Sequence, residues 1–204
     1  MPTVLLIRHG ENDFVKKGRL AGRLPGVHLN ARGQAQASAL AETLKGIKLA
    51  AVYSSPLDRA VETARPLAAA QKLRVLRRPG LAETLLGDWE GKSIKALQRD
   101  KRWRALQERP AQFRFPGGES MLEQLARLVG EVQALCAAHK AKDVIACVSH
   151  ADPIKLIIAH YVGMPLDQFQ RLLIHTASVS TLVIHDDRVL LERLNWVAPE
   201  KPSK

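Results

Sequence analysis

The chain has 204 residues, of which 46% are hydrophobic and 25% charged, a composition that suits one soluble globular domain, expected over residues 1–197. Its formal net charge of +11 favours an anionic partner, whereas only 4% aromatic residues argues against the stacking platforms that bind single-stranded nucleic acid. No apolar run approaches the roughly 18 residues of a membrane span, and no leader segment precedes the first apolar run, so we expect a cytoplasmic protein without a membrane partner.

The first part of the chain alternates strand-like and helix-like segments. Strand-like runs cover residues 3–7, 49–55 and 73–78, and helix-like runs cover residues 30–46 and 56–71. Asn30 is the expected N-cap of the first helix, which closes at Gly46, and Pro56 suits the first turn of the second helix. This alternation predicts an α/β fold with buried strands.

The second part begins with an excursion. Residues 81–116 lose clear periodicity, and we expect them to pass over one end of the sheet as an excursion or lid over the active site. A long amphipathic helix (117–140), a buried strand (143–150) and two antiparallel runs (172–185 and 188–196) follow. The Asp186–Asp187 pair marks the turn between those two runs, and residues 198–204 read as a disordered tail.

Polar residues that are suited to catalysis or to anion binding follow three of the predicted strands. Arg8 and His9 follow the first strand, Arg59 lies just beyond the second, and His150 ends the strand at 143–150. Ligands of open α/β sheets bind beyond the carboxyl ends of the strands, so both arginines and both histidines should face one crevice. Guanidinium groups match phosphate oxygens, and imidazole serves as nucleophile or donor, so this set favours a phosphoryl ligand.

Five stretches carry a family resemblance. In chain order they are LLIRHGEN, SSPLDRAVETA, LAETLLGDWEG, FPGGES and VSHAD, and they lie between residues 4 and 152, about three quarters of the chain. Together they resemble the motifs of the histidine phosphatase superfamily, the phosphoglycerate-mutase-like proteins, in its smaller phosphatase-type branch. The resemblance implies a three-layer α/β sandwich with a mostly parallel central sheet flanked by helices.

The resemblance also implies a catalytic role for five positions. His9 would be the nucleophile that becomes phosphohistidine, while Arg8 and Arg59 would hold the non-bridging phosphate oxygens. His150, expected to be protonated, would add a further donor. Glu83 matches the family's proton donor to the leaving alkoxide.

The acid role at Glu83 requires a raised pKa. We expect the neighbouring Trp89 and Leu85 to supply an apolar wall that raises it. The rival acids are Glu11, Asp88 and Glu90.

The substrate contacts follow the resemblance less closely. Gly10 and Ala151, each beside one of the two histidines, are candidate contacts, although many relatives have glycine where this chain has Ala151. Val15 stands where many members have a phosphate-binding Asn or Thr, and Asn12 is the candidate replacement. Arg23, in the basic loop after the nucleophile, would meet a second anionic group of the substrate or lie on the solvated surface.

No metal or cofactor is expected. The remaining histidines form neither HxH nor HExxH spacing, and the two cysteines, Cys136 and Cys147, have no CxxC spacing. The arginines and histidines of the predicted crevice already supply the donors that a phosphoryl group needs.

Three functions fit the sequence. The first is a metal-independent phosphatase, a phosphoric monoester hydrolase that acts on phosphorylated small molecules through phosphohistidine on His9. The first alternative is a phosphoglycerate-type phosphomutase, although the extra segments typical of such mutases have little room in this chain. The second is a basic, non-catalytic module that binds phosphate or nucleic acid. We expect no nucleic-acid partner, and the sequence leaves the oligomeric state open, with a dimer among the options.

Overall fold

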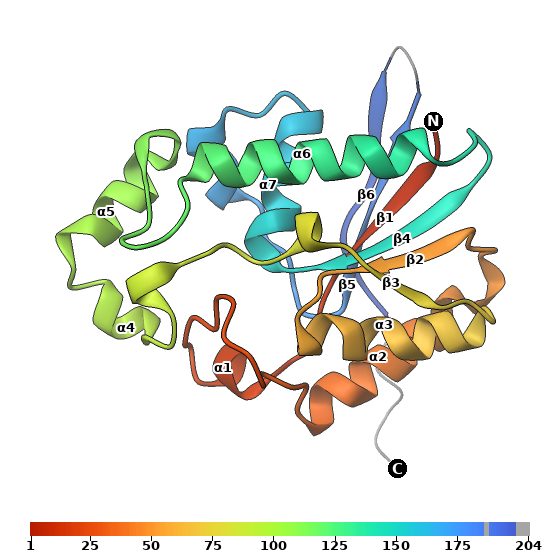
Figure 1. Cartoon of the computed structure of the whole chain (residues 1–204), viewed down its shortest axis with the longest axis horizontal. Coiled ribbons are helices and arrows are strands. Elements are labelled where there is room, and N and C mark those ends of the chain that lie inside the picture. Colours follow the sequence, from red (N-terminus) through yellow and green to blue (C-terminus); the bar gives the residue numbers. More distant parts are fainter. Residues whose placement is uncertain (186–187, 199–204) are drawn as a thin grey trace.

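A six-stranded sheet forms the centre of the computed structural model, which describes residues 1–185 and 188–198 (Figure 1). The strands are β1 (Thr3–Arg8), β2 (Ala51–Ser54), β3 (Val75–Arg77), β4 (Val144–Ser149), β5 (Ser178–Ile184) and β6 (Val189–Val197). Their order across the sheet is β3-β2-β4-β1-β5-β6. The four strands β1 to β4 pair in parallel, and β5 and β6 add an antiparallel edge beside β1. The mostly parallel sheet expected from the sequence is therefore confirmed.

Strand β1 shows why the sheet is covered on both faces. Its residues alternate between two apolar clusters, with Val4 and Leu6 in one and Leu5 and Ile7 in the other. Each of these four side chains is at most 4% exposed. Successive side chains of a strand point to opposite faces, so a continuous apolar run requires a packed layer on each side.

Helices supply those two layers. One face is covered by α2 (Ala31–Thr43) and α3 (Asp58–Ala70), and the opposite face by α6 (Met121–Ala137) and α7 (Ala151–Tyr161) (Figure 1). The fold is thus a three-layer α/β sandwich. None of the helices in the described ranges has the length and apolarity that crossing a membrane requires.

The other three α-helices of the described residues are short and lie beyond one end of the sheet. They are α1 (Asp13–Lys16), α4 (Ile94–Leu97) and α5 (Lys101–Glu108), grouped in Figure 1 away from the chain's N-terminus. The predicted excursion contains α4 and α5, and an aromatic cluster packs within it, with the Trp89 ring centroid 5.5 Å from those of Phe113 and Phe115. Apolar packing therefore orders this segment in the absence of clear periodicity.

Some element boundaries differ from the expected ones. Helix α3 begins at Asp58 after an extended Leu57, so Pro56 precedes the helix and is not in its first turn. Helix α6 begins only at Met121, because Ser120 and Glu123 form a capping box there. The Asn30 cap of α2 is confirmed, since its side chain accepts from the Gly33 amide. The Asp186–Asp187 turn and the tail after residue 198 lie outside the described residues.

Candidate active site

The pairing of β1 with β4 brings the two predicted histidines together. Arg8 lies opposite Ser149 in the parallel register, so His9 and His150 follow their strands side by side. Their ring centroids are 5.1 Å apart with an interplanar angle of 60°. Arg59, near the N-terminus of α3, joins them, and these two histidines and Arg59 are each at most 3% exposed. The carboxyl ends of the strands thus assemble a buried cationic site.

A cavity of about 340 Å³ opens at this edge of the sheet. Six of the nine predicted site residues line it, namely Arg8, His9, Asn12, Arg59, Glu83 and Ala151. The other three predicted residues, Gly10, Arg23 and His150, are not part of the wall, although His150 lies directly behind His9.

The His9 ring is held in one orientation. Its Nδ1 lies 2.7 Å from the carbonyl oxygen of Gly10, which can only accept, so Nδ1 carries the proton and Nε2 keeps its lone pair. Burial, followed by the charges of Arg59 and Arg8, holds the pKa of His9 well below its ordinary value. His9 is therefore a neutral imidazole with a free nucleophilic nitrogen.

Only some of the N–H donors of the two arginines near His9 form hydrogen bonds to the protein. Arg8 Nη1 donates to the Ile174 carbonyl and Arg59 Nη2 to the Gly22 carbonyl, both at 2.7 Å. Within the described ranges, the buried Nε of Arg8, the Nε and Nη1 of Arg59 and the Nδ2 of Asn12 have no protein partner. Buried donors are nearly always satisfied, so this group of unpaired N–H bonds indicates a binding site for an oxyanion.

His150 differs from its predicted charge state. Its Nε2 lies 2.8 Å from Ser55 Oγ, and its Nδ1 lies 3.8 Å from a carboxylate oxygen of Glu83. Burial, Arg59 and His9 together place the pKa of His150 well below its ordinary value. This lowered pKa disagrees with the protonated His150 expected from the sequence, because complete desolvation beside two arginines disfavours a third charge.

Glu83 has the electrostatics of a general acid. Its side chain accepts from the Thr84 amide at 2.9 Å, and burial together with the charge of Asp152 raises its pKa to about 7. The predicted cause of this shift was only partly right: Leu85 is 36% exposed, and Trp89 packs into the aromatic cluster. Asp152, in the first turn of α7, lines the cavity but is not among the predicted site residues, although its place two positions after His150 puts it at the same edge.

Two predicted substrate contacts have other partners. The Gly10 amide donates to Thr63 Oγ1 at 2.9 Å. The Arg23 guanidinium donates to the Glu83 carbonyl and to the Glu119 carboxylate, at 2.7 and 3.0 Å, instead of reaching into the cavity. None of the rival acids Glu11, Asp88 and Glu90 lines the cavity.

Gly10 is required by backbone packing. A Cβ at this position would lie 2.6 Å from the carbonyl oxygen of Gly33 in α2, a backbone atom that cannot move alone. Gly10→Ala is therefore expected to destabilise the protein by about 1–3 kcal/mol. Gly130→Ala is the matched control, because the exposed Gly130 of α6 has open space around its Cβ, and alanine there should stabilise the helix by roughly 0.5–1 kcal/mol. Urea unfolding measures the stability of both variants. Equal unfolding midpoints for Gly10→Ala and Gly130→Ala would contradict this expectation.

Across residues 1–185 and 188–198, no three His, Cys, Asp or Glu side chains gather as a metal site requires.

The geometry defines a class of protein: an α/β sandwich with a neutral histidine and two partly unpaired arginines in a buried pocket at the carboxyl edge of its sheet. The chain belongs to the histidine phosphatase superfamily (branch 1), whose family model matches residues 4–197. The resemblance noted in the sequence is thereby confirmed.

Relatives with named activities cover nearly the whole chain. Phosphoserine phosphatase 1 of Hydrogenobacter thermophilus is 30% identical over 96% of this chain and 92% of its own length. A Proteus mirabilis protein named "Probable phosphoglycerate mutase GpmB" is 30% identical over 97% of this chain and 89% of its own. A mycobacterial glucosyl-3-phosphoglycerate phosphatase, solved in complex with VO3, has a TM-score of 0.88 and 28% identity over 96% of this chain and all of its own. These likenesses support a histidine-phosphatase-type enzyme without defining its substrate.

Proposed function

We propose that the protein is a metal-independent phosphatase that hydrolyses phosphomonoesters of small molecules through a phosphohistidine intermediate on His9. The observation that carries this proposal is the His9 ring, held by the Gly10 carbonyl with Nε2 unprotonated, beside unpaired donors of Arg8 and Arg59. Phosphoryl transfer depends mainly on positioning and on fixed positive charge, and this pocket supplies both.

In the first step, Nε2 of His9 attacks phosphorus and the bond from phosphorus to the ester oxygen breaks. The unpaired N–H groups of Arg8 and Arg59 receive the non-bridging oxygens. Glu83, whose pKa of about 7 keeps much of its carboxyl group protonated at neutral pH, gives its proton to the departing alkoxide. The product alcohol then leaves, and Glu83 remains as a carboxylate.

In the second step, water replaces the alcohol. The Glu83 carboxylate takes a proton from the water as the water oxygen attacks phosphorus, and the bond from phosphorus to His9 Nε2 breaks. Inorganic phosphate is released, and Glu83 is again protonated. One residue thus serves as acid and then as base, and its pKa near neutrality suits both tasks.

A phosphoglycerate-type phosphomutase is the second candidate, favoured by the name of the Proteus mirabilis relative. It would use the same first step but return the phosphoryl group to the substrate. A third possibility, a non-catalytic phosphate-binding module, needs neither the free Nε2 of His9 nor the raised pKa of Glu83.

One assay separates these functions. The enzyme in EDTA is incubated with 3-phosphoglycerate and, separately, with p-nitrophenyl phosphate, and inorganic phosphate and phosphoglycerate isomers are measured. We expect inorganic phosphate from p-nitrophenyl phosphate at an undiminished rate in EDTA. Formation of 2-phosphoglycerate without phosphate release would favour the mutase, and no turnover of any phosphomonoester would favour the binding module.

The apolar part of the cavity wall suits an apolar alcohol. Seven large apolar side chains line the cavity beside its polar residues, namely Val15, Leu20, Leu86, Ile94, Trp103, Leu106 and Phe115. We therefore expect Trp103→Ala to lower kcat/KM for benzyl phosphate about tenfold more than for glycerol 3-phosphate. Trp196→Ala, which removes a tryptophan remote from the cavity, is the control and should leave the ratio unchanged. An equal loss on both substrates in Trp103→Ala would contradict an apolar leaving-group wall.

A further inference from the structure

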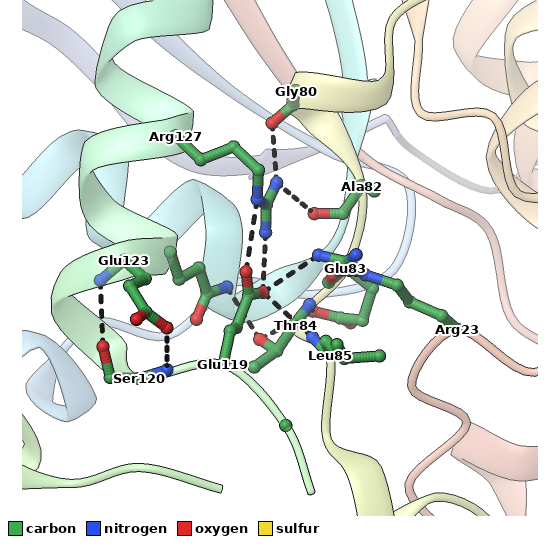
Figure 2. Close-up of polar contacts among 12 residues, drawn as sticks. Arg23, Gly80, Ala82, Glu83, Thr84, Leu85, Glu119, Ser120, Glu123 and Arg127 are labelled. Carbon is green, nitrogen blue, oxygen red and sulfur yellow. Dashed lines mark hydrogen bonds and ion pairs between the residues drawn. The ribbon is translucent and has the colours of Figure 1, made fainter.

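The segment that carries Glu83 is held mainly by side chains from elsewhere in the chain. Residues 80–85, called the acid loop below, form no strand or α-helix. Three charged residues surround this loop: Arg127 on α6, Glu119 just before α6, and Arg23 from the loop after His9 (Figure 2).

Arg127 spans the acid loop and Glu119 at once. Its Nη1 donates to the carbonyl oxygens of Gly80 and Ala82, at 2.8 and 3.1 Å. Its Nη2 and Nε donate to the two carboxylate oxygens of Glu119, at 2.8 and 3.3 Å. This use of the planar guanidinium cannot be reproduced by a lysine, whose ammonium is a point charge on a flexible stem.

Glu119 and Arg23 complete the contacts around Glu83. Glu119 Oε1 accepts from the Leu85 amide at 2.9 Å and from Arg23 Nη2 at 3.0 Å. Arg23 Nε then donates to the carbonyl oxygen of Glu83 itself at 2.7 Å. The carbonyls of Gly80, Ala82 and Glu83 and the amide of Leu85 are thus all bound by these three side chains.

These contacts are shielded from solvent. The side chains of Arg23, Glu119 and Arg127 are 31%, 13% and 23% exposed. Arg127 and Glu119 also lie outside the cavity wall, so neither side chain touches a substrate bound there. Partly buried and charge-assisted hydrogen bonds hold a geometry better than exposed ion pairs, which contribute little.

We propose that Arg127, Glu119 and Arg23 are positioning residues that fix the Glu83 carboxyl group for proton transfer to the leaving alkoxide. This inference rests on the proposed function and adds three residues to it. Arg23 also follows Gly22, whose carbonyl accepts from Arg59 at 2.7 Å. The loop at residues 22–23 therefore links the phosphate-binding arginine to the acid loop, and both depend on one backbone segment.

The role predicts a selective kinetic defect in Arg127→Met. Misplacing a catalytic group by about 1 Å costs on the order of 100-fold in rate, so single-turnover phosphoenzyme formation from benzyl phosphate should slow by up to that factor, with little change in substrate affinity. Phosphoenzyme formation from p-nitrophenyl phosphate, whose leaving group needs no proton, should be affected far less. Arg127→Lys should fail as Arg127→Met does, because lysine keeps the charge without the bidentate geometry.

The control variant is Arg104→Met. It breaks the ion pair between Arg104 and Glu108 of α5, at 2.6 Å, and neither residue is a hydrogen-bond partner of the acid loop. This variant should keep the activity ratio between benzyl and p-nitrophenyl phosphate. Thermal unfolding of both variants separates a loss of stability from a loss of positioning.

A double variant decides between positioning and general damage. In the Glu83→Gln background, Arg127→Met should cause no further loss on benzyl phosphate, since the proton donor is already absent. Multiplicative losses, or equal losses on both substrates in the single variant, would overturn the positioning role. If Glu83→Gln alone shows no leaving-group dependence, the acid role in the proposed function fails instead, so the two failures are distinguishable.

Discussion

Replacement of His9 by alanine is expected to lower kcat for p-nitrophenyl phosphate on the order of 10⁴-fold or more, because it removes the nucleophile on which we propose the covalent intermediate forms. The arginine donors remain, so KM should change much less. Steady-state kinetics on purified protein, free of the host's own phosphatases, measures both constants.

The control for this variant is His160→Ala. His160 is an exposed histidine in the last turn of α7, whereas His150 precedes the first turn of that helix. His160 does not line the cavity. Its replacement should leave kcat and KM unchanged. A His9→Ala protein that keeps a substantial part of the wild-type kcat would contradict the nucleophilic role of His9.

The second large effect is expected for Glu83→Gln. Loss of a general acid typically costs 10²- to 10⁴-fold, and we expect this loss in phosphoenzyme formation from benzyl phosphate. Formation from p-nitrophenyl phosphate, a good leaving group, should be far less affected. Single-turnover rates on the two substrates give the comparison, and equal losses on both would remove Glu83 from the acid role.

The pKa of Glu83 adds a pH dependence with a definite sign. Since the carboxyl group titrates near pH 7, phosphoenzyme formation from benzyl phosphate should fall as pH rises through 7 in the wild type, and this limb should be absent in Glu83→Gln. A rate limb that survives the substitution would assign the titration to another group.

The same shift affects stability. A raised folded-state pKa favours folding below the unfolded value of 4.5, and this contribution is lost as pH rises through about 7. At pH 8, Glu83→Gln should therefore be more stable than the wild type, by up to about 3 kcal/mol, with no gain at pH 4. Urea unfolding at both pH values tests this, and a variant destabilised at pH 8 would argue against a strained, buried carboxylate.

The fold was predictable from the sequence where apolar residues form a continuous run. The apolar run of β1 and that of β4 predicted buried parallel strands, and their polar ends predicted that His9 and His150 would meet. The start of α3 was not predictable from Pro56, because the extended conformation of Leu57 delays the helix. Local propensity indicates that a helix forms, whereas the surrounding packing decides its first residue.

The position of the site was predictable from the sequence, whereas the charge states of its residues were less predictable. Strand ends and motif order placed Arg8, His9 and Arg59 around one cavity, but the charge of His150 depends on complete burial beside two arginines. Because its loop is basic, Arg23 was expected to contact a second anionic group of the substrate or to lie on the solvated surface. Its actual partners, the Glu83 carbonyl and Glu119, are 60 and 96 residues away in sequence, so no local pattern indicates them.

The central claim is that the phosphoryl group passes through His9, and trapping it there is the most direct test. The wild-type protein is mixed with excess p-nitrophenyl phosphate, quenched within milliseconds in alkaline denaturant, and analysed by mass spectrometry of the intact chain and its peptides. We predict one acid-labile phosphoryl group on His9, absent from His9→Ala and present in His160→Ala. A phosphoryl group on another residue, or full turnover with no phosphoenzyme at any quench time, would contradict the mechanism.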